Sequence, residues 1–212
     1  MTINRKRHHP FLEVLTLCLI AFPFTVGARE PAGLAGIDQQ ISELAGHLDR
    51  YPAHIASRKE LKQVQSRLDE ALKRVNRLAA KEPGNAQIRW RLGELYRMAH
   101  NIDRPGAWEN SERYLKEAIK LDPRGYGAWL SLGRLYVSTN LDYAKRAESC
   151  FISAQKLYGS KVLTEAHRGL FFVYYYQGRM QEAVGEADIV LSVLPDDPAM
   201  PGLREIAKAL DN

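Results

Sequence analysis

The sequence has few of the residues from which catalytic and metal sites are built. It contains only two cysteines, Cys18 and Cys150, in 212 residues, which is too few for a structural zinc site. Its six histidines form no metal-binding or protease motif, and the sequence has neither a glycine-rich phosphate loop nor a serine-hydrolase motif. We therefore predict no enzyme, no metal and no cofactor, and we interpret Cys150 as a packed thiol.

Strand patterns are missing too. No segment alternates apolar and polar residues over a convincing length, and no turn dipeptide joins two β-branched runs. The longest apolar run, Val14–Val26, is shorter than the roughly 20 residues that a membrane-spanning helix needs. From Ile37 onward the apolar residues recur at helical spacing. The sequence therefore predicts an all-α protein.

The N-terminus is typical of a secretory signal peptide. Basic residues 5–7 precede the apolar run, Pro23 interrupts it, and Gly27 and Ala28 are small residues suited to cleavage. Leu17, which precedes Cys18, is not the small residue that a lipoprotein cysteine requires. We predict a signal peptide over residues 1–28 and export, to a bacterial periplasm. The alternative is an uncleaved segment that anchors the chain in the inner membrane.

Cleavage would change the charge balance. The net charge of +5 would fall to +3, because residues 1–28 contain Arg5, Lys6, Arg7 and Glu13. Much of the basic excess therefore belongs to targeting, and we expect no nucleic-acid partner. Contact with a membrane is expected only through the N-terminal segment, if it stays uncleaved. A cleaved chain retains Cys150 alone, so it can form no intrachain disulfide.

Residues 29–36 are predicted to be a flexible leader, and residues 37–82 a helical hairpin. The apolar positions of its two helices are Ile37, Ile41, Leu44 and Leu48, and then Leu61, Val64, Leu68, Ala71, Val75 and Leu78. Both sets follow steps of three and four, which place them on one face of each helix. The second helix also ends like the second half of a degenerate repeat. The same spacing permits a coiled coil with another copy of the chain.

An internal repeat follows over residues 83–212. The segment Leu92–Tyr96 (LGELY) reappears as Leu132–Tyr136 (LGRLY), and a weaker third copy is Leu170–Tyr174 (LFFVY). Each copy is followed by a second helical segment and then by a helix breaker. Repeats of about 40 residues that contain two helices are typical of solenoids. The predicted repeats cover about residues 86–125, 126–160 and 164–197, with a capping helix at 199–210.

The repeats resemble tetratricopeptide repeats (TPRs), whose signature is Trp, Leu-Gly and Tyr in the first helix, then Ala and Phe in the second. The residues that match and form the expected repeat core are Leu92, Gly93, Tyr96, Trp129, Leu132, Gly133, Tyr136, Ala147, Phe151, Leu170, Tyr174 and Ala183. The third copy has Phe171 where glycine is expected. The first copy carries an insertion near Ala99–Ala107. The resemblance implies a solenoid of antiparallel helix pairs, with an N-terminal hairpin and a C-terminal capping helix.

The resemblance also implies a binding surface, because the first helices of successive TPRs line a concave groove. Carried over by register, the candidate groove residues are Trp90, Glu94, Arg97, Met98, Leu130, Arg134, Val137, Ser138, Arg168, Phe172, Tyr175 and Tyr176. Aromatic residues and arginines often anchor protein partners. The paired asparagines and lysines with which some TPR grooves bind a C-terminal carboxylate are absent from these positions, so that ligand is not expected.

The dense aromatic segment Phe171–Tyr176 allows two interpretations. Its groove-facing residues Phe172 and Tyr175 could contact a partner, or residues 199–210 could cover them. For function we predict a non-catalytic exported adaptor or scaffold that binds a protein or peptide and assists an envelope complex. The alternative is a structural platform that self-associates, as a homo-oligomer, through the helices of residues 37–81.

Overall fold

The computed structural model describes residues 34, 36–49 and 53–211. Within these residues the protein is all-α, with nine α-helices, one short 3-10 helix and no strand. The helices are α1 (Ile37–Leu48), α2 (Arg58–Lys81), α3 (Ala86–His100), α4 (Ala107–Leu121), α5 (Tyr126–Val137), η2 (Leu141–Tyr143), α6 (Ala144–Tyr158), α7 (Thr164–Tyr176), α8 (Met180–Val193) and α9 (Met200–Leu210). The predicted signal peptide, residues 1–28, lies outside the described residues, as do residues 29–33 and 35 of the predicted leader.

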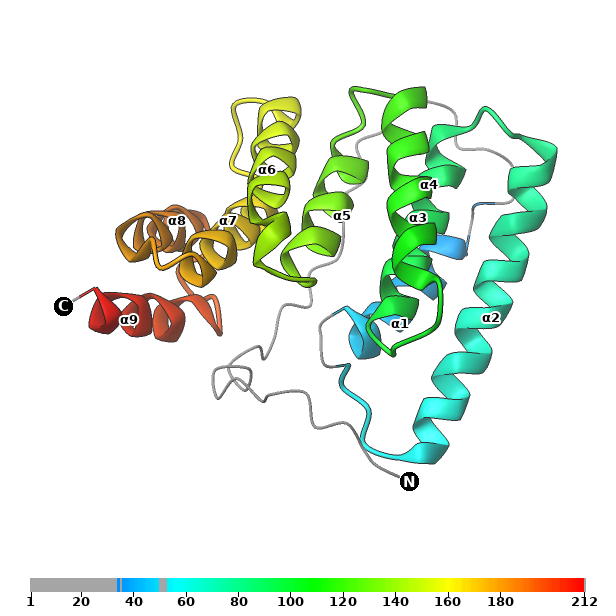
Figure 1. The fold of residues 1–212 in the computed structure, drawn as a ribbon, viewed down its shortest axis with the longest axis horizontal. Helices are drawn as coiled ribbons and strands as arrows, with labels where there is room; N and C mark the ends of the chain where they lie inside the picture. The colour runs from blue at the N-terminus through cyan, green and yellow to red at the C-terminus, as the bar shows by residue number, and fades with distance from the viewer. Residues whose placement is uncertain (1–33, 35, 50–52, 212) are drawn as a thin grey trace.

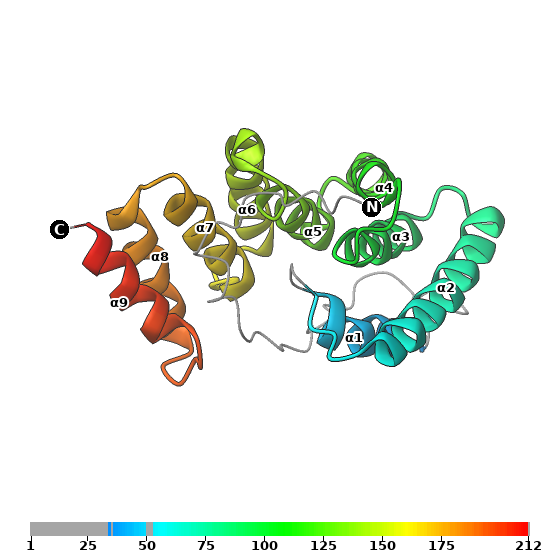
Figure 2. The same ribbon diagram turned by 60° about the horizontal axis from the view of Figure 1, so that its bottom comes forward.

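Three helix pairs form a solenoid, as predicted. The pairs α3–α4, α5–α6 and α7–α8 stack in order along the chain (Figures 1 and 2). The first helices also contact one another, α3 with α5 and α5 with α7. The stack therefore curves with α3, α5 and α7 on its inner side and α4, α6 and α8 outside. None of the helices in the described part of the chain is long and apolar enough to cross a membrane.

Side chains in the preceding turns fix where the helices begin. Ser57 precedes α2, and its hydroxyl accepts a hydrogen bond from the Glu60 backbone N–H at 3.1 Å, while Glu60 Oε2 accepts one from Ala56 N–H at 2.7 Å. Before α3, the Asn85 side chain accepts hydrogen bonds from two backbone N–H groups of the first turn. These bonds satisfy donors that a helix N-terminus would otherwise leave unpaired.

Glycines allow the helices of the stack to approach one another. A Cβ atom at Gly133 would lie 2.8 Å from the Phe151 ring, and one at Gly169 would lie 2.3 Å from the same ring. Phe151, on α6, is fully buried and therefore packs against both α5 and α7. The sequence pattern singled out Gly133 but not Gly169, which lies two residues before the position where a glycine is expected in the third repeat.

The tyrosines of the second and third repeats occupy equivalent positions. Tyr136 donates a hydrogen bond to Glu112 of α4 at 2.7 Å, and Tyr174 donates one to Glu148 of α6 at 3.2 Å. Each bond joins a first helix to the second helix of the preceding repeat. The third repeat therefore keeps the register of the second, although Phe171 stands in place of glycine and is fully buried.

The insertion in the first repeat lies between α3 and α4. It consists of the end of α3, which continues to His100, and of the turn formed by residues 101–106. The Arg104 Nη1 atom lies 2.5 Å from Asp69 Oδ1 on α2, and Ile102 packs against the N-terminal part of the core. The insertion therefore extends a helix and also contacts the preceding helix.

The two ends of the described chain differ in how they pack. Helix α1 contacts α2, as the predicted hairpin requires, but it also packs against α3. Figure 2 shows α1 on the inner side of the curve, where it faces α3. At the other end α9 packs against α8 through Met200, Leu203 and Ala207, which are buried. Helix α1 thus lies on the surface predicted to be a groove.

Candidate functional site

Helix α1 covers the inner face of the first repeat with its apolar side. Its four periodic residues Ile37, Ile41, Leu44 and Leu48 are all buried and belong to one cluster with residues of α2 and α3. The outward-facing Ser42 and Glu43 are exposed. The helix therefore covers part of the inner face on which the candidate groove residues lie.

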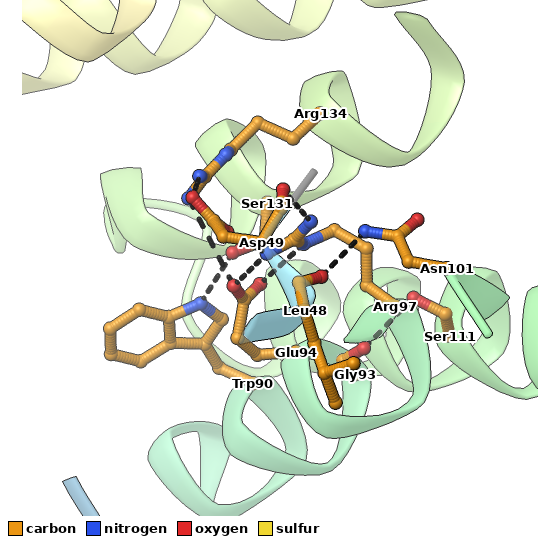
Figure 3. Close-up of polar contacts among 10 residues, drawn as sticks. All are labelled: Leu48, Asp49, Trp90, Gly93, Glu94, Arg97, Asn101, Ser111, Ser131 and Arg134. Carbon is orange, nitrogen blue, oxygen red and sulfur yellow. Dashed lines mark hydrogen bonds and ion pairs between the residues drawn. The ribbon is translucent and has the colours of Figure 1, made fainter. Parts of the chain in front are cut away.

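The C-terminal end of α1 forms an ion-pair network with α3 and α5 (Figure 3). Asp49, the residue that follows α1, pairs with Arg97 of α3 through one carboxylate oxygen and with Arg134 of α5 through the other. Glu94 contacts Arg97 through two bonds of 2.6 and 3.1 Å and lies 4.0 Å from Arg134. Two carboxylates and two guanidinium groups thus meet between three helices.

The charges of this network support one another. Burial alone would raise the pKa of Asp49, but the nearby guanidinium groups of Arg134 and Arg97 outweigh it and hold the pKa below its usual value. Burial acts in the same way on Glu94, and the charge and hydrogen bonds of Arg97 lower its pKa. The pKa of Arg97 is raised, because its two carboxylate partners outweigh the effect of burial. All three groups are therefore charged at neutral pH.

A second ion pair holds the N-terminal end of α1. Arg91 of α3 donates hydrogen bonds of 2.8 and 2.7 Å to the two carboxylate oxygens of Asp38. The Arg91 side chain is 2% exposed, and its Nη1 atom also donates to Gln87 within α3. Near the other end, the Asn101 side-chain amide donates to the Leu48 backbone carbonyl at 2.7 Å. Helix α1 is therefore held at both ends by polar side chains of the first repeat.

Part of the predicted groove is not open, because α1 covers it. Glu94, Arg97 and Met98 are buried, at 3%, 2% and 1% exposed. We predicted that these three residues face a partner directly, but in this structure α1 covers them. The reason is that α1, which we expected to form a hairpin with α2, packs across α3 as well. Leu130 of α5 is also buried.

Trp90 has a different role from the one predicted. Its indole N–H donates a hydrogen bond to the Ser131 hydroxyl on α5 at 2.9 Å, and its ring lies 2.9 Å from where a Cβ of Gly127 would be. The half-buried side chain therefore joins the first repeat to the second. Figure 3 shows Trp90 and Ser131 beside the ion-pair network.

The open part of the predicted groove lies on α7. Phe172 and Tyr175 are half-buried, and Tyr176 is 38% exposed. The rings contact one another and Phe171, with centroid distances of 5.2–6.0 Å. Helix α9 packs against α8 and leaves Tyr176 exposed. Arg134 and Val137 of α5 and Ser138, which follows the helix, are half-buried.

Arg168 does not belong to the open surface. It is 7% exposed and pairs with Asp197, which precedes α9. Asp197 also accepts hydrogen bonds from the backbone N–H groups of Ala199 and Met200. The prediction that Arg168 faces a ligand is therefore wrong, because this arginine fastens the C-terminal helix to the last repeat.

The predicted repeat core is buried for the most part. Leu92, Gly93, Leu132, Gly133, Tyr136, Ala147, Phe151, Leu170, Tyr174 and Ala183 are buried, whereas Tyr96 and Trp129 are half-buried. Tyr96 stacks on Tyr114 of α4 with ring centroids 5.6 Å apart. The indole N–H of Trp129 donates to the Pro123 carbonyl at 3.3 Å.

The side chains most often used in catalysis are engaged in packing. Cys150 is buried, and burial raises the pKa of its thiol to about 12. His167 of α7 lies between Glu186 of α8, at 2.6 Å, and Gln155 of α6, at 3.1 Å. No group of three or more His, Cys, Asp or Glu residues that could hold a metal ion occurs in the described part of the chain.

Several residues of the site were not identified from the sequence. They are Asp38, Asp49, Arg91, Asn101, Ser131 and Asp197. A signal for two of them does exist, since Asp38 and Asp49 directly follow the first and the last residue of the apolar stripe of α1. The partners of these aspartates could not be read from the sequence, because nothing in the spacing places α1 against α3 and α5.

Comparisons with known proteins agree with this architecture. The tetratricopeptide repeat model matches residues 61–104, which contain most of α2 and all of α3. Among solved structures, a thermophilic TPR protein of Thermus thermophilus is similar, with 21% sequence identity and a TM-score of 0.57, over 82% of this chain and 80% of that one. The comparison with curated proteins gives no match. The likeness shows a shared helical solenoid fold, and the sequence match overlaps the strongest predicted repeats, 86–160, only at its end.

Proposed function

We propose that this protein is an exported, non-catalytic adaptor or scaffold that binds a segment of another protein on the inner face of its solenoid. TPR solenoids in general mediate contacts between proteins, and this chain has their fold. The observation that carries the proposal is the aromatic surface of α7, formed by Phe172, Tyr175 and Tyr176. It lies on an inner helix, and α9 leaves Tyr176 exposed.

The chemistry of this surface suits a protein ligand. Three adjacent aromatic rings, of which Tyr176 is the exposed one, provide apolar contacts, and tyrosine hydroxyls add hydrogen-bonding groups. The Tyr176 hydroxyl is neutral at pH 7 and can donate; partial burial and the neighbouring Tyr175 raise its pKa further. The surface therefore fits an extended or helical segment with apolar side chains better than it fits an anion.

Export is proposed on the N-terminal sequence alone, with its basic residues, apolar run and small residues before Arg29. A bacterial periplasm is the compartment that we propose, and an envelope complex is the proposed setting. The intact mass of the protein recovered from the envelope tests this. A chain that begins at Arg29 supports cleavage, and one that begins at Met1 shows that the segment is retained.

Self-association through residues 37–81 is the weaker alternative. It depends on apolar residues that are available to a second copy, yet Ile37, Ile41, Leu44 and Leu48 of α1 are buried against the same chain. On α2, Val64, Leu68, Ala71 and Val75 are buried as well. The surface that the coiled-coil interpretation requires is therefore already used within the chain.

Crosslinking in the native envelope, followed by identification of the captured protein, tests the adaptor function. The Phe172→Ala/Tyr175→Ala variant should remain helical by circular dichroism and capture less of that protein. The matched control is Ile152→Ala/Val193→Ala, which removes exposed apolar side chains from the outer helices α6 and α8 and should leave capture unchanged. If the Phe172→Ala/Tyr175→Ala variant unfolds, the single variant Tyr176→Ala, at an exposed position, is used instead. Reduced capture by this variant supports the proposal, and unchanged capture contradicts it. Undiminished capture by a folded α7 variant would contradict the proposal.

A further inference from the structure

We infer that α1 is an internal ligand, and that the surface beneath it binds an amphipathic partner helix with a carboxylate near each end. The inference rests on the proposed function in that both place the ligand on the inner face. It adds which segment of the chain competes with the partner and which chemistry the partner carries. The contacts of α1 supply a template, because they show what this surface accepts.

The first element of the template is apolar. Ile37, Ile41, Leu44 and Leu48 are spaced by four, three and four, and all are buried. This is the spacing by which an amphipathic helix binds in a groove. A partner helix with leucine, isoleucine or valine at these four relative positions would bury the same stripe against α3.

The second element is the carboxylate at the position of Asp49. An acidic side chain at the C-terminal end of a helix is unfavourable, because the helix dipole places negative charge there. Asp49 therefore does not stabilise α1 itself. Its position is explained by Arg97 and Arg134, with which it pairs. The negative charge of Asp49 is unfavourable for α1 but complements the arginines of the surface beneath it. We therefore assign this carboxylate to recognition of that surface.

Part of the ion-pair network lies within α3 and does not depend on α1. Glu94 stays bonded to Arg97 within α3, at 2.6 and 3.1 Å, and lies 4.0 Å from Arg134. One carboxylate would then remain beside two guanidinium groups, and the surface would carry one unbalanced positive charge. Glu94 thus keeps Arg97 in position for a second carboxylate, which Asp49 now supplies and which also pairs with Arg134 (Figure 3).

The third element is the carboxylate at the other end. Asp38 receives two hydrogen bonds from Arg91, which is buried to 2% exposure. Asp38 and Asp49 are eleven residues apart, which is about 16 Å along a helix at about 1.5 Å per residue. Two arginine sites at that separation select a helix in which two carboxylates are about three turns apart, because both carboxylates must reach an arginine.

Helix α1 is suited to exchange. It has 12 residues, and isolated helices shorter than about 12–15 residues are marginal in water. It belongs to none of the three stacked pairs, so its release leaves the contacts α3–α4, α5–α6 and α7–α8 in place. Residues 53–57, which precede α2, lie outside any helix. A competing helix therefore has to replace the contacts of only one short element.

A partner protein is a better occupant than a second copy of this chain. The α1 helix of another copy would repeat the contacts already present and add none. A partner segment that continues beyond the position of Asp49 could pass from α5 to the neighbouring helix α7 and contact Tyr175 and Tyr176. It would then gain apolar contacts that α1 does not make, and this difference would favour replacement.

A labelled peptide tests the inference without the natural partner. The probe is a fluorescent synthetic peptide with the sequence of residues 36–49, and its anisotropy is measured with the full chain. Leu44→Ser weakens the docking of the internal helix and leaves α3 and α5 unaltered. We expect this variant to bind the peptide about tenfold more tightly than the unaltered chain, which corresponds to about 1.4 kcal/mol. Glu43→Ser, at an exposed position of α1, is the matched control and should bind like the unaltered chain.

The charge requirement is tested with a second peptide in which both aspartates are asparagine. It should bind the Leu44→Ser chain about tenfold more weakly, and Arg134→Gln in that chain should reduce the difference between the two peptides. If Leu44→Ser does not fold, Asp49→Asn replaces it, because that change removes a charge and no apolar group. Equal binding of both peptides, or no binding to a folded variant, would overturn the inference.

The molar mass of the chain, measured by light scattering over a range of concentrations, shows whether a second copy of the chain occupies the surface beneath α1. A monomer at all concentrations supports a partner protein, whereas a dimer that the peptide dissociates would show exchange of α1 between copies and would overturn the choice of a partner. The inference and the proposed function fail separately. Loss of peptide binding bears on α1 alone, and undiminished capture by the α7 variant bears on the aromatic surface alone.

Discussion

Asp49 and Arg134 are 85 residues apart in the sequence and form an ion pair between the end of α1 and the second repeat. The pair joins an N-terminal helix to a repeat with which it shares no loop. It also ties the first repeat to the second, because Asp49 contacts Arg97 of α3 at the same time. Asp49 therefore contributes both to the stability of the solenoid and to the covering of its inner face.

Removal of this carboxylate should weaken the chain measurably. Asp49→Ala should lower the free energy of unfolding by about 1–3 kcal/mol, the usual cost of leaving buried hydrogen-bond donors without an acceptor. Urea unfolding followed by circular dichroism measures the change. Asp211→Ala, at an exposed position beyond α9, is the control and should have little effect. Equal stability of both variants would contradict the structural role of Asp49.

Acid should destabilise the chain through the same network. The pKa values of Asp49 and Glu94 are lowered from 3.8 and 4.5, so the unfolded chain binds more protons than the folded chain as the pH falls below these values. Their contribution is complete above about pH 4.5 and is lost as the pH falls through the lower folded-state pKa values. Urea unfolding at pH 7 and at pH values below 4 measures the loss. A chain with Asp49→Asn should lose less stability over this interval.

Addition of one methyl group at either glycine beside Phe151 should strain the stack. Gly133→Ala and Gly169→Ala each place a Cβ within 3 Å of the ring, and overpacking of this kind costs about 1–3 kcal/mol. Gly185→Ala is the control, because its Cβ would have nothing within 4 Å and alanine favours a helix by up to about 1 kcal/mol. Thermal unfolding should therefore show opposite shifts. Gly169→Ala combined with Phe151→Leu should recover part of the loss.

Removal of the negative charge of Asp197 should destabilise the chain, because it leaves the buried charge of Arg168 unpaired. The side chains of Arg168 and Asp197 are 8% and 1% exposed, and Nε and Nη1 of Arg168 have no hydrogen-bond partner within the described part of the chain. Asp197→Asn keeps a side-chain oxygen that can bond the first N–H groups of α9 but leaves the arginine uncompensated. It should cost about 3–5 kcal/mol. Arg168→Met added to Asp197→Asn should restore most of the stability, and a further loss would contradict this assignment.

Cys150 should be unreactive in the folded protein. Burial raises the pKa of its thiol to about 12, so the thiolate that reacts with alkylating reagents is scarce at neutral pH. Protein that begins at Arg29 should show no alkylation by iodoacetamide in the native state and one modified thiol in urea, by intact mass. Protein that retains residues 1–28 carries Cys18 in addition. Fast native labelling of Cys150 would show that α6 is more open than the structure indicates.

The repeats could be predicted because their packing is local. The motif residues Leu132, Gly133 and Tyr136 are four residues apart or fewer, and helical periodicity alone places them on one face. The predicted groove positions did fall on the inner helices. Phe172 and Tyr175 remain near a surface, as the register indicated. The fold class and the identity of the inner helices therefore followed from short-range spacing.

The position of α1 could not be predicted in the same way. Its apolar stripe identified α1 as an amphipathic helix. The stripe did not identify the surface against which α1 packs. That choice depends on Arg91, Arg97 and Arg134, whose side chains meet only in the folded chain. Arg168 was predicted to face the groove for the same reason, since its partner Asp197 follows the last repeat and lies outside the repeat pattern. Ion pairs between residues that are distant in the sequence help to determine which part of the inner face is covered. A repeat signature describes only residues within one repeat and therefore does not predict these pairs.

The ring of Phe151 has a consequence for how the repeats unfold. It packs against both Gly133 and Gly169, so separation of α7 from α5 and α6 exposes a large apolar side chain of the second repeat as well. In a solenoid, stability is the sum of terms for each repeat and for each interface between neighbours. A strong interface term makes adjacent repeats melt as one cooperative unit rather than in sequence. The hydrogen-bonded amides of α5, α6 and α7 should accordingly exchange with a common free energy of opening, although these helices belong to two repeats.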